Sequence, residues 1–135
     1  LEEAFIVQTN WDLRKGQPYV ISCSETLEQK IESVRFHKGF TGTAGGFYGP
    51  QGRVLRLEIQ DSELNSKMDA FEFEGTKMTN LEMETAAIYG LGKLLGHNCL
   101  SLNAIIANRA NGTFSADPYK AVDELIAYTL QKLSE

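Results

Sequence analysis

The pattern of apolar and polar positions along the chain predicts an alternation of strands and helices. A helical start over the opening residues gives way to a polar connection that ends at Gly16 and Pro18. Residues 19–23 form a short apolar run typical of a β-strand. Ser24, followed by an acidic residue, fits the N-cap of a helix that ends near Ser33. We therefore expect a strand followed by a helix in this part of the chain.

Two further strands are expected around a glycine-rich loop. Residues 36–43 resemble a strand that enters the loop 45–52, and residues 53–59 alternate between apolar and polar like another strand. The loop superficially suggests a dinucleotide-binding turn, but it leads into a strand-like segment instead of a helix, so the geometry that cradles phosphate is not expected. The polar stretch 60–78 gives no clear assignment beyond a short helix near residues 62–71.

The C-terminal part of the chain completes a layered α/β pattern. Residues 79–95 show helical spacing of apolar positions, and Gly96 is a good residue to end that helix. Residues 99–107 are a nearly continuous apolar run, as in strands covered on both faces. Asp117 then provides an N-cap, with proline at the first helical position, for a final amphipathic helix over residues 118–133.

Composition excludes several classes of protein. The 135 residues are 42% hydrophobic and 23% charged, as in ordinary globular proteins. A net charge of -5 without a basic cluster argues against nucleic acid as a partner, and no apolar stretch approaches the roughly 20 residues that a membrane span needs. The acidic start is unlike a signal peptide, so a cytoplasmic location is expected. The chain does not begin with Met, which suggests a piece of something longer.

Three side chains on the glycine-rich loop offer what a uracil ring requires. Phe47 can stack on the ring, and the Gln51 amide can pair with a ring N–H and the neighbouring carbonyl. The guanidinium of Arg53 can donate to ring oxygens and stabilise the negative charge that develops on departing uracil. Taken alone, these three residues favour a solvent-exposed turn without function over a binding site.

A second group of residues suits a sugar. The carboxylates of Glu82 and Glu84 can accept hydrogen bonds from vicinal hydroxyls, and Met83 can pack on the sugar through its thioether. Residues two apart do not share one helical face, but they could converge if Glu82 precedes the regular helix. A nearby carboxylate would stabilise the oxocarbenium-like transition state of glycosyl transfer. The alternative is an acidic decoration of a helix N-terminus.

The end of the apolar run 99–107 is a third candidate position. Ligand crevices of open α/β sheets lie beyond the carboxyl ends of strands, so Arg109 could face a pocket or be a surface residue. His37 and His97 have no partner at metal-ligand spacing, and the sequence contains no serine nucleophile motif. We therefore expect neither a metal site nor a nucleophilic side chain.

Together the three groups resemble a known enzyme family. Phe-x-x-x-Gln-x-Arg at residues 47–53, Glu-Met-Glu at 82–84 and Ile-x-Asn-Arg at 106–109 occur in the order found in uridine phosphorylases of the nucleoside phosphorylase family. The joint match is far more specific than its parts. It covers most of the chain and is similar to the C-terminal half of a family member. The fold class implied is therefore α/β, a layered mixed-sheet nucleoside phosphorylase fold of which residues 1–135 form the C-terminal part of a single domain.

The resemblance also implies roles for the residues. Phe47, Gln51 and Arg53 would bind uracil, and Glu82, Met83 and Glu84 would bind the ribose and the adjoining base region. Ile106, Ala107 and Arg109 would line the base pocket. Arg53 and Glu84 would be the catalytic residues.

The reaction implied is reversible phosphorolysis of uridine to uracil and ribose 1-phosphate. Inorganic phosphate would be the co-substrate, with no organic cofactor, and the intact protein would be a homo-oligomer built from dimers. Purine-specific relatives and related nucleosidases have an aspartate after the corresponding strand, where this chain has Asn108 and Arg109. That difference favours a pyrimidine.

The sequence departs from the family pattern in two ways. Gly52 stands where an acidic residue can occur between the Gln and the Arg. The chain also lacks the N-terminal half, which in the family supplies the phosphate-binding residues, so the isolated segment is expected to be inactive. The alternatives are a phosphorylase or nucleosidase acting on purine or other nucleosides, and a non-catalytic nucleobase-binding subunit.

Overall fold

The chain divides into two compact units, each made of two stretches of sequence. The computed structural model describes residues 1–108 and 111–135. The first unit comprises Leu1–Ile21 and Lys38–Ala87, and the second comprises Ser22–His37 and Ile88–Glu135.

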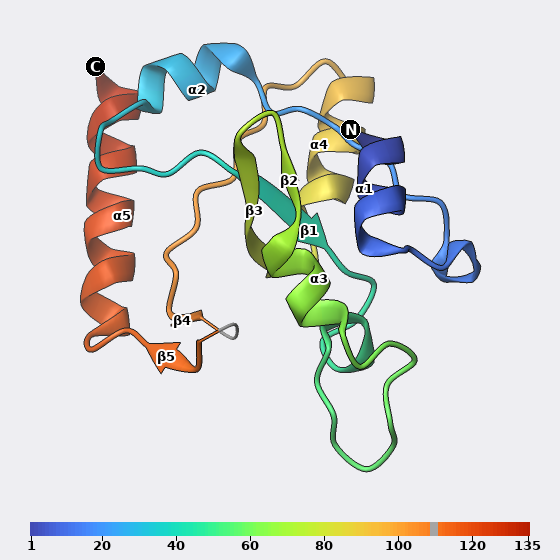
Figure 1. The fold of residues 1–135 in the computed structure, drawn as a ribbon. Helices are drawn as coiled ribbons and strands as arrows, with labels where there is room; N and C mark the ends of the chain where they lie inside the picture. Colours follow the sequence, from blue (N-terminus) through green and yellow to red (C-terminus); the bar gives the residue numbers. More distant parts are fainter. Residues whose placement is uncertain (109–110) are drawn as a thin grey trace. The chain divides into compact units, whose positions relative to one another are not determined.

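A small mixed sheet forms the centre of the first unit. The unit contains α1 (Glu2–Thr9), β1 (Phe40–Thr43), α3 (Leu64–Ala70), β2 (Glu72–Phe73), β3 (Thr76–Glu82) and the first residues of α4 (Thr85–Leu94), with short 3₁₀ turns at Leu13–Lys15 and Gly49–Gln51. The strand order is β1-β3-β2, with β1 parallel and β2 antiparallel to β3 (Figure 1). Glu74 and Gly75 join β2 to β3 with φ of 51° and 77°, the left-handed conformations that a two-residue hairpin turn requires.

Aromatic packing holds this unit together. The ring of Phe71 is 2% exposed and meets Phe5 edge-on, with ring centroids 5.2 Å apart. Phe40 of β1 lies 5.9 Å from the same ring, and α3 adds the buried side chains of Leu64 and Met68. Burial of these apolar surfaces brings α1 and α3 together and anchors the start of β1.

The strand predicted over residues 53–59 is wrong. Its apolar side chains bury no face, since Leu57, for example, is exposed. The segment instead leads to Asp61, whose carboxylate accepts hydrogen bonds from the ammonium groups of Lys15 and Lys67, each at 3.1 Å. Burial opposes ionisation of Asp61, but the bonds from Lys67 and Lys15 outweigh it and lower its pKa. Polar contacts rather than strand pairing therefore hold this loop.

Helices dominate the second unit. It contains α2 (Glu25–Ile31), most of α4, β4 (Ala107–Asn108), β5 (Thr113–Phe114) and α5 (Pro118–Ser134). Ser24 caps α2 by accepting from Leu27 N–H at 3.4 Å, and Asp117 caps α5 by accepting from Lys120 N–H at 3.0 Å. Both predicted caps are confirmed. The hydroxyl of Tyr128 in α5 donates to the carbonyl of Ile31 at 3.0 Å and so ties α5 to the end of α2.

Two predicted strands do not form. Residues 19–23 are irregular, and of the run 99–107 only its end enters β4. In that run the N–H of Ser101 donates to the Tyr89 hydroxyl at 2.6 Å instead of to a strand. A buried strand needs neighbours on both sides, and among residues 1–108 and 111–135 the run pairs only with β5. In the described residues, the run 99–107 therefore has the apolar composition of a buried strand without the neighbouring strands that would cover it in a sheet.

The helix predicted over residues 79–95 starts later than expected. Thr79–Glu82 is the end of strand β3, and regular helix begins only at Thr85. Burial in β3 alternates only over Thr76–Asn80, and Leu81 and Glu82 break the period-2 pattern, so the end of the strand gave no alternating signal to oppose the helical spacing. The strand predicted over residues 36–43 is confirmed in its second half, and the helix near residues 62–71 corresponds to α3.

Candidate functional site

The site residues of the first unit lie at the carboxyl ends of two adjacent parallel strands. β1 and β3 are in register so that their last residues, Thr43 and Glu82, are partners. The loop after β1 carries Phe47, Gln51 and Arg53, while Met83 and Glu84 follow β3 directly. In open α/β sheets this edge is where ligands bind. The fold thus brings together both predicted groups, the uracil group and the ribose group.

The uracil group sits on a tight reversal of the chain. The N–H groups of Gln51 and Arg53 both donate to the carbonyl of Tyr48, at 3.0 and 2.9 Å. Gly52 between them has φ of 73°, which favours glycine, and a Cβ there would lie 2.7 Å from side-chain atoms of Asn65. This reversal fixes Gln51 and Arg53 close together.

The Gln51 amide is buried and held at both ends. Its side chain is 2% exposed, its Oε1 accepts from Arg53 Nη1 at 2.8 Å, and its Nε2 donates to the Glu82 carbonyl at 3.5 Å. Arg53 Nη1 also donates to the carbonyl of Phe47. The guanidinium lies 3.5 Å from the centre of the Phe47 ring, which is half exposed. One amide, one cation and one aromatic face are therefore preassembled.

Glu82 serves as an anchor at the start of α4. Its Oε1 accepts from the Thr43 hydroxyl, and its Oε2 accepts from the N–H groups of Glu84 and Thr85, both at 2.7 Å. Burial opposes ionisation, but hydrogen bonds from Thr43, Glu84 and Thr85 outweigh it and lower the pKa of Glu82. The carboxylate is thus ionised and caps the first turn of the helix.

The neighbouring residues are more accessible. Met83 and Glu84 are both exposed, and the Glu84 carboxylate accepts from the N–H of Met83 at 3.2 Å. The condition for the two carboxylates to converge, that Glu82 precedes regular helix, is met, because two residues separate Glu82 from α4. An exposed carboxylate and a thioether therefore follow the buried anchor.

The third predicted group belongs to the second unit. Ile106 and Ala107 are exposed there, with Ala107 paired to Phe114 in the β4–β5 hairpin. Arg109 lies outside the described residues.

Sequence reasoning missed Thr43. Its hydroxyl donates to Glu82 and accepts from the N–H of Ala86 at 2.9 Å, so it links the end of β1 to the end of β3 and the start of α4. The available signal was its position as a polar residue at the end of a predicted strand, just before the glycine-rich loop.

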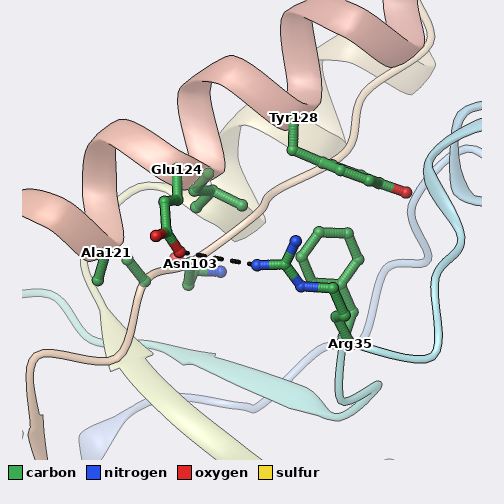
Figure 2. A pocket seen from close by; sticks show the side chains of 8 residues that line it. Arg35, Asn103, Ala121, Glu124 and Tyr128 are labelled. Atoms are coloured by element: carbon green, nitrogen blue, oxygen red, sulfur yellow. Dashed lines mark ion pairs between the residues drawn. The ribbon is translucent and has the colours of Figure 1, made fainter.

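A separate shallow pocket of about 190 Å³ lies in the second unit. Figure 2 shows the Arg35 guanidinium facing the Glu124 carboxylate of α5, with an ion-pair distance of 3.6 Å. Phe36 packs edge-on against Tyr128, with ring centroids 5.0 Å apart. The side chains that line it are Arg35, Phe36, Asn103, Ala104, Ala121, Glu124, Leu125 and Tyr128. None of the predicted site residues that the structure describes is among them.

Residues 1–108 and 111–135 contain no group of three or more His, Cys, Asp or Glu side chains arranged to hold a metal ion. Over the same residues, no helix has the length and apolar character needed to cross a membrane.

Comparison with known proteins gives consistent results. The sequence pattern of the phosphorylase superfamily matches residues 6–135. A uridine phosphorylase of Thermococcus kodakarensis is 30% identical over 95 residues, which are 70% of this chain and 32% of that protein. The structure matches a crystal structure of the Trypanosoma brucei nucleoside phosphorylase, a protein that shows uridine phosphorylase activity, with a TM-score of 0.80 and 25% identity.

These matches cover most of this chain but less than half of each relative. The structural match covers 98% of this chain but 48% of the trypanosome chain, so the chain spans at most about half the length of these relatives. The expected mixed-sheet nucleoside phosphorylase fold, present in part, is confirmed by this match. On the match over residues 6–135, the chain belongs to the phosphorylase superfamily.

Proposed function

We propose that the natural protein is a uridine phosphorylase, which transfers the ribosyl group of uridine to inorganic phosphate and releases uracil. The observation that carries this proposal is the buried Gln51 amide at the carboxyl edge of β1 and β3, held between Arg53 and the Glu82 carbonyl. A positioned amide can accept from the ring N–H of uracil and donate to the adjacent carbonyl.

The remaining roles follow from the chemistry of each side chain. Phe47 stacks on the base, and Arg53 stabilises the negative charge that develops on the leaving uracil oxygens. Glu82, Met83 and Glu84 form the ribose-binding segment, with the Glu84 carboxylate close to the sugar hydroxyls. The family resemblance alone assigns Ile106, Ala107 and Arg109 to the base pocket. Arg53 and Glu84 are the proposed catalytic residues.

The relatives support a nucleoside substrate. The Thermococcus protein is named a uridine phosphorylase, and the trypanosome protein shows that activity. Within this chain, Asn108 after the apolar run favours a pyrimidine over a purine, since purine-specific relatives place an aspartate there.

The exposed apolar surface of the chain supports the proposal that activity requires the other half of the fold. The chain forms two compact units, and two separate globular proteins of half its mass would together expose about 8,500 Å² of surface. The chain exposes 9782 Å², which is more than two well-packed units of this size would expose. In the second unit, apolar side chains of α4 and α5 are between 49% and 84% exposed: Ile88, Leu91, Leu94, Ile126, Leu130 and Leu133. We therefore propose that residues 1–135 alone are inactive, and that they act as part of one domain whose other half covers these faces and supplies the phosphate site.

Other properties of the intact protein remain predictions from the family resemblance. These are phosphate as co-substrate without an organic cofactor, a cytoplasmic location and a homo-oligomeric state.

The direct test is phosphate-dependent release of uracil from uridine. The longest natural polypeptide that contains residues 1–135 is compared with the 135-residue chain, using uridine and inosine in parallel. We expect the longer protein to cleave uridine only when phosphate is present, and the short chain to be inactive. Cleavage of inosine but not uridine would establish a purine enzyme instead, and cleavage without phosphate a nucleosidase. Binding of uracil without any cleavage would indicate a non-catalytic nucleobase-binding subunit.

A matched pair of variants tests the role of Gln51. Gln51→Leu removes both amide contacts to the base, so kcat/KM for uridine should fall roughly 10- to 100-fold. Gln60→Leu makes the same replacement at an exposed amide that bonds to Asp12 at 3.1 Å, and it should change kcat/KM little. Equal losses of kcat/KM for uridine in the two variants would show that Gln51 does not contact the base.

A further inference from the structure

The Thr43 hydroxyl lies at the junction of three elements. It donates to the Glu82 carboxylate at the end of β3 and accepts from the N–H of Ala86 in the first turn of α4. Thr43 itself ends β1 and is the register partner of Glu82. A single hydroxyl therefore connects the two parallel strands to the helix that follows the ribose-binding segment.

The Glu82 carboxylate is bonded within the protein at both of its oxygens. Its oxygens accept from the Thr43 hydroxyl and from the N–H groups of Glu84 and Thr85, and the Thr85 hydroxyl also donates to it. An ionised carboxylate offers about four acceptor positions, so these donors use most of them. A sugar hydroxyl would compete with donors that include the N–H groups at the start of α4.

The Glu84 side chain is in a different situation. Its backbone N–H is held by Glu82, which fixes where residue 84 leaves the strand, while its carboxylate is exposed. The backbone of Glu82 is fixed as well, because its carbonyl accepts from Ala44 N–H at 2.8 Å and from Gln51 Nε2 at 3.5 Å. The exposed carboxylate is thus carried on a rigid support.

From this geometry we propose that Thr43 is a positioning residue for ribose: through the Glu82 carboxylate it fixes the turn that presents Glu84, the carboxylate assigned above to the sugar hydroxyls. This inference rests on the proposed nucleoside phosphorylase function. It gives Glu82 and Glu84 different roles within the ribose-binding segment. Glu82 contributes as an anchor and helix cap, and Glu84 contributes the contact.

The chemistry of threonine explains why this position needs a hydroxyl. Only a hydroxyl can donate to a carboxylate and accept from a backbone N–H with the same atom. Serine retains both functions, whereas valine has nearly the shape of threonine and provides neither. Thr43→Val therefore removes the hydrogen bonds with little change in volume, and Thr43→Ser restores them.

The experiment uses these two variants with a control in the same strand. Thr41→Val makes the same replacement two residues earlier in β1, where the threonine hydroxyl forms no hydrogen bond within residues 1–108 and 111–135. In the longest natural polypeptide, Thr43→Val should raise KM for uridine or lower kcat so that kcat/KM falls roughly 10- to 100-fold, the range for a lost bond to a charged group. KM for phosphate should not change. Thr43→Ser should remain close to wild type, as should Thr41→Val.

A second readout does not depend on activity. In the longest natural polypeptide, the carboxyl carbon of Glu82 is titrated by NMR. Thr43→Val should raise the Glu82 pKa relative to wild type, and Thr43→Ser and Thr41→Val should not. If Thr43→Val does not fold, Glu82→Gln is measured in the longer protein, where the same selective loss of uridine kcat/KM is expected.

Several results would overturn the inference. These are equal losses in Thr43→Val and Thr41→Val, a failure of Thr43→Ser to restore activity, an equal rise in KM for phosphate, or an unchanged Glu82 pKa in Thr43→Val. If the wild-type protein cleaves no nucleoside, the proposed function fails by itself, and the titration still decides whether the Thr43–Glu82 contact exists.

Discussion

The side chain of Phe71 provides the sharpest test of how the first unit is held together. Phe71→Ala removes the largest fully buried side chain of the described residues, which packs against Phe5 at 5.2 Å and Phe40 at 5.9 Å. Truncation of a buried phenylalanine costs about 3–5 kcal/mol, because apolar transfer energy is lost and a cavity remains. A whole domain is stable by only roughly 5–15 kcal/mol, so most of the stability of this unit should disappear.

The chain carries a suitable reporter and a suitable control. Trp11 is its single tryptophan, and its ring lies 5.4 Å from that of Phe5, so tryptophan fluorescence during urea unfolding follows the same cluster. Phe114→Ala makes the identical replacement at a ring that is 80% exposed, and its effect should stay within about 0.5 kcal/mol. A loss of less than about 1 kcal/mol for Phe71→Ala, or equal losses in both variants, would refute the assignment of Phe71 as the packing centre.

Three further outcomes are expected. Gly52→Ala should destabilise the first unit by about 1–2 kcal/mol and raise KM for uridine, because φ is 73° and the new Cβ would meet Asn65; an unchanged urea midpoint would contradict this. Asp117→Ala should cost about 1 kcal/mol and reduce helical circular dichroism, since it removes the cap of α5; a variant as helical as wild type would argue against that cap. The pKa of Glu82 is lowered on folding, so its stabilising contribution is present above its ordinary value of 4.5 and is lost as the pH falls through the lower folded value. Urea midpoints measured from pH 6 to pH 3 should therefore fall less steeply in Glu82→Gln than in wild type, and parallel curves would exclude this contribution.

Local signals in the sequence predicted some elements well. The caps at Ser24 and Asp117 involve donors only three residues away, so a short window of sequence contains both partners. The residue types and spacing of the loop from Phe47 to Arg53 are equally local, but the base recognition that they indicate stays a prediction.

Features that depend on distant partners could not be predicted in this way. The run 99–107 has the composition of a buried strand, yet strand formation requires neighbours that hydropathy does not identify. Thr43 was missed for the same reason, because its acceptor Glu82 is 39 residues further along the chain. The preorganised amide of Gln51 likewise depends on the Glu82 carbonyl, 31 residues away.

The exposed apolar faces of α4 and α5 have a practical consequence for work with the 135-residue chain. Surfaces of this kind associate with one another when nothing else covers them, and a net charge of -5 gives only modest repulsion. The isolated chain should therefore form assemblies whose size grows with protein concentration and shrinks when mild detergent is added. Such assemblies would form through the exposed apolar faces of α4 and α5. A defined oligomer of the natural protein would instead keep one size across a dilution series.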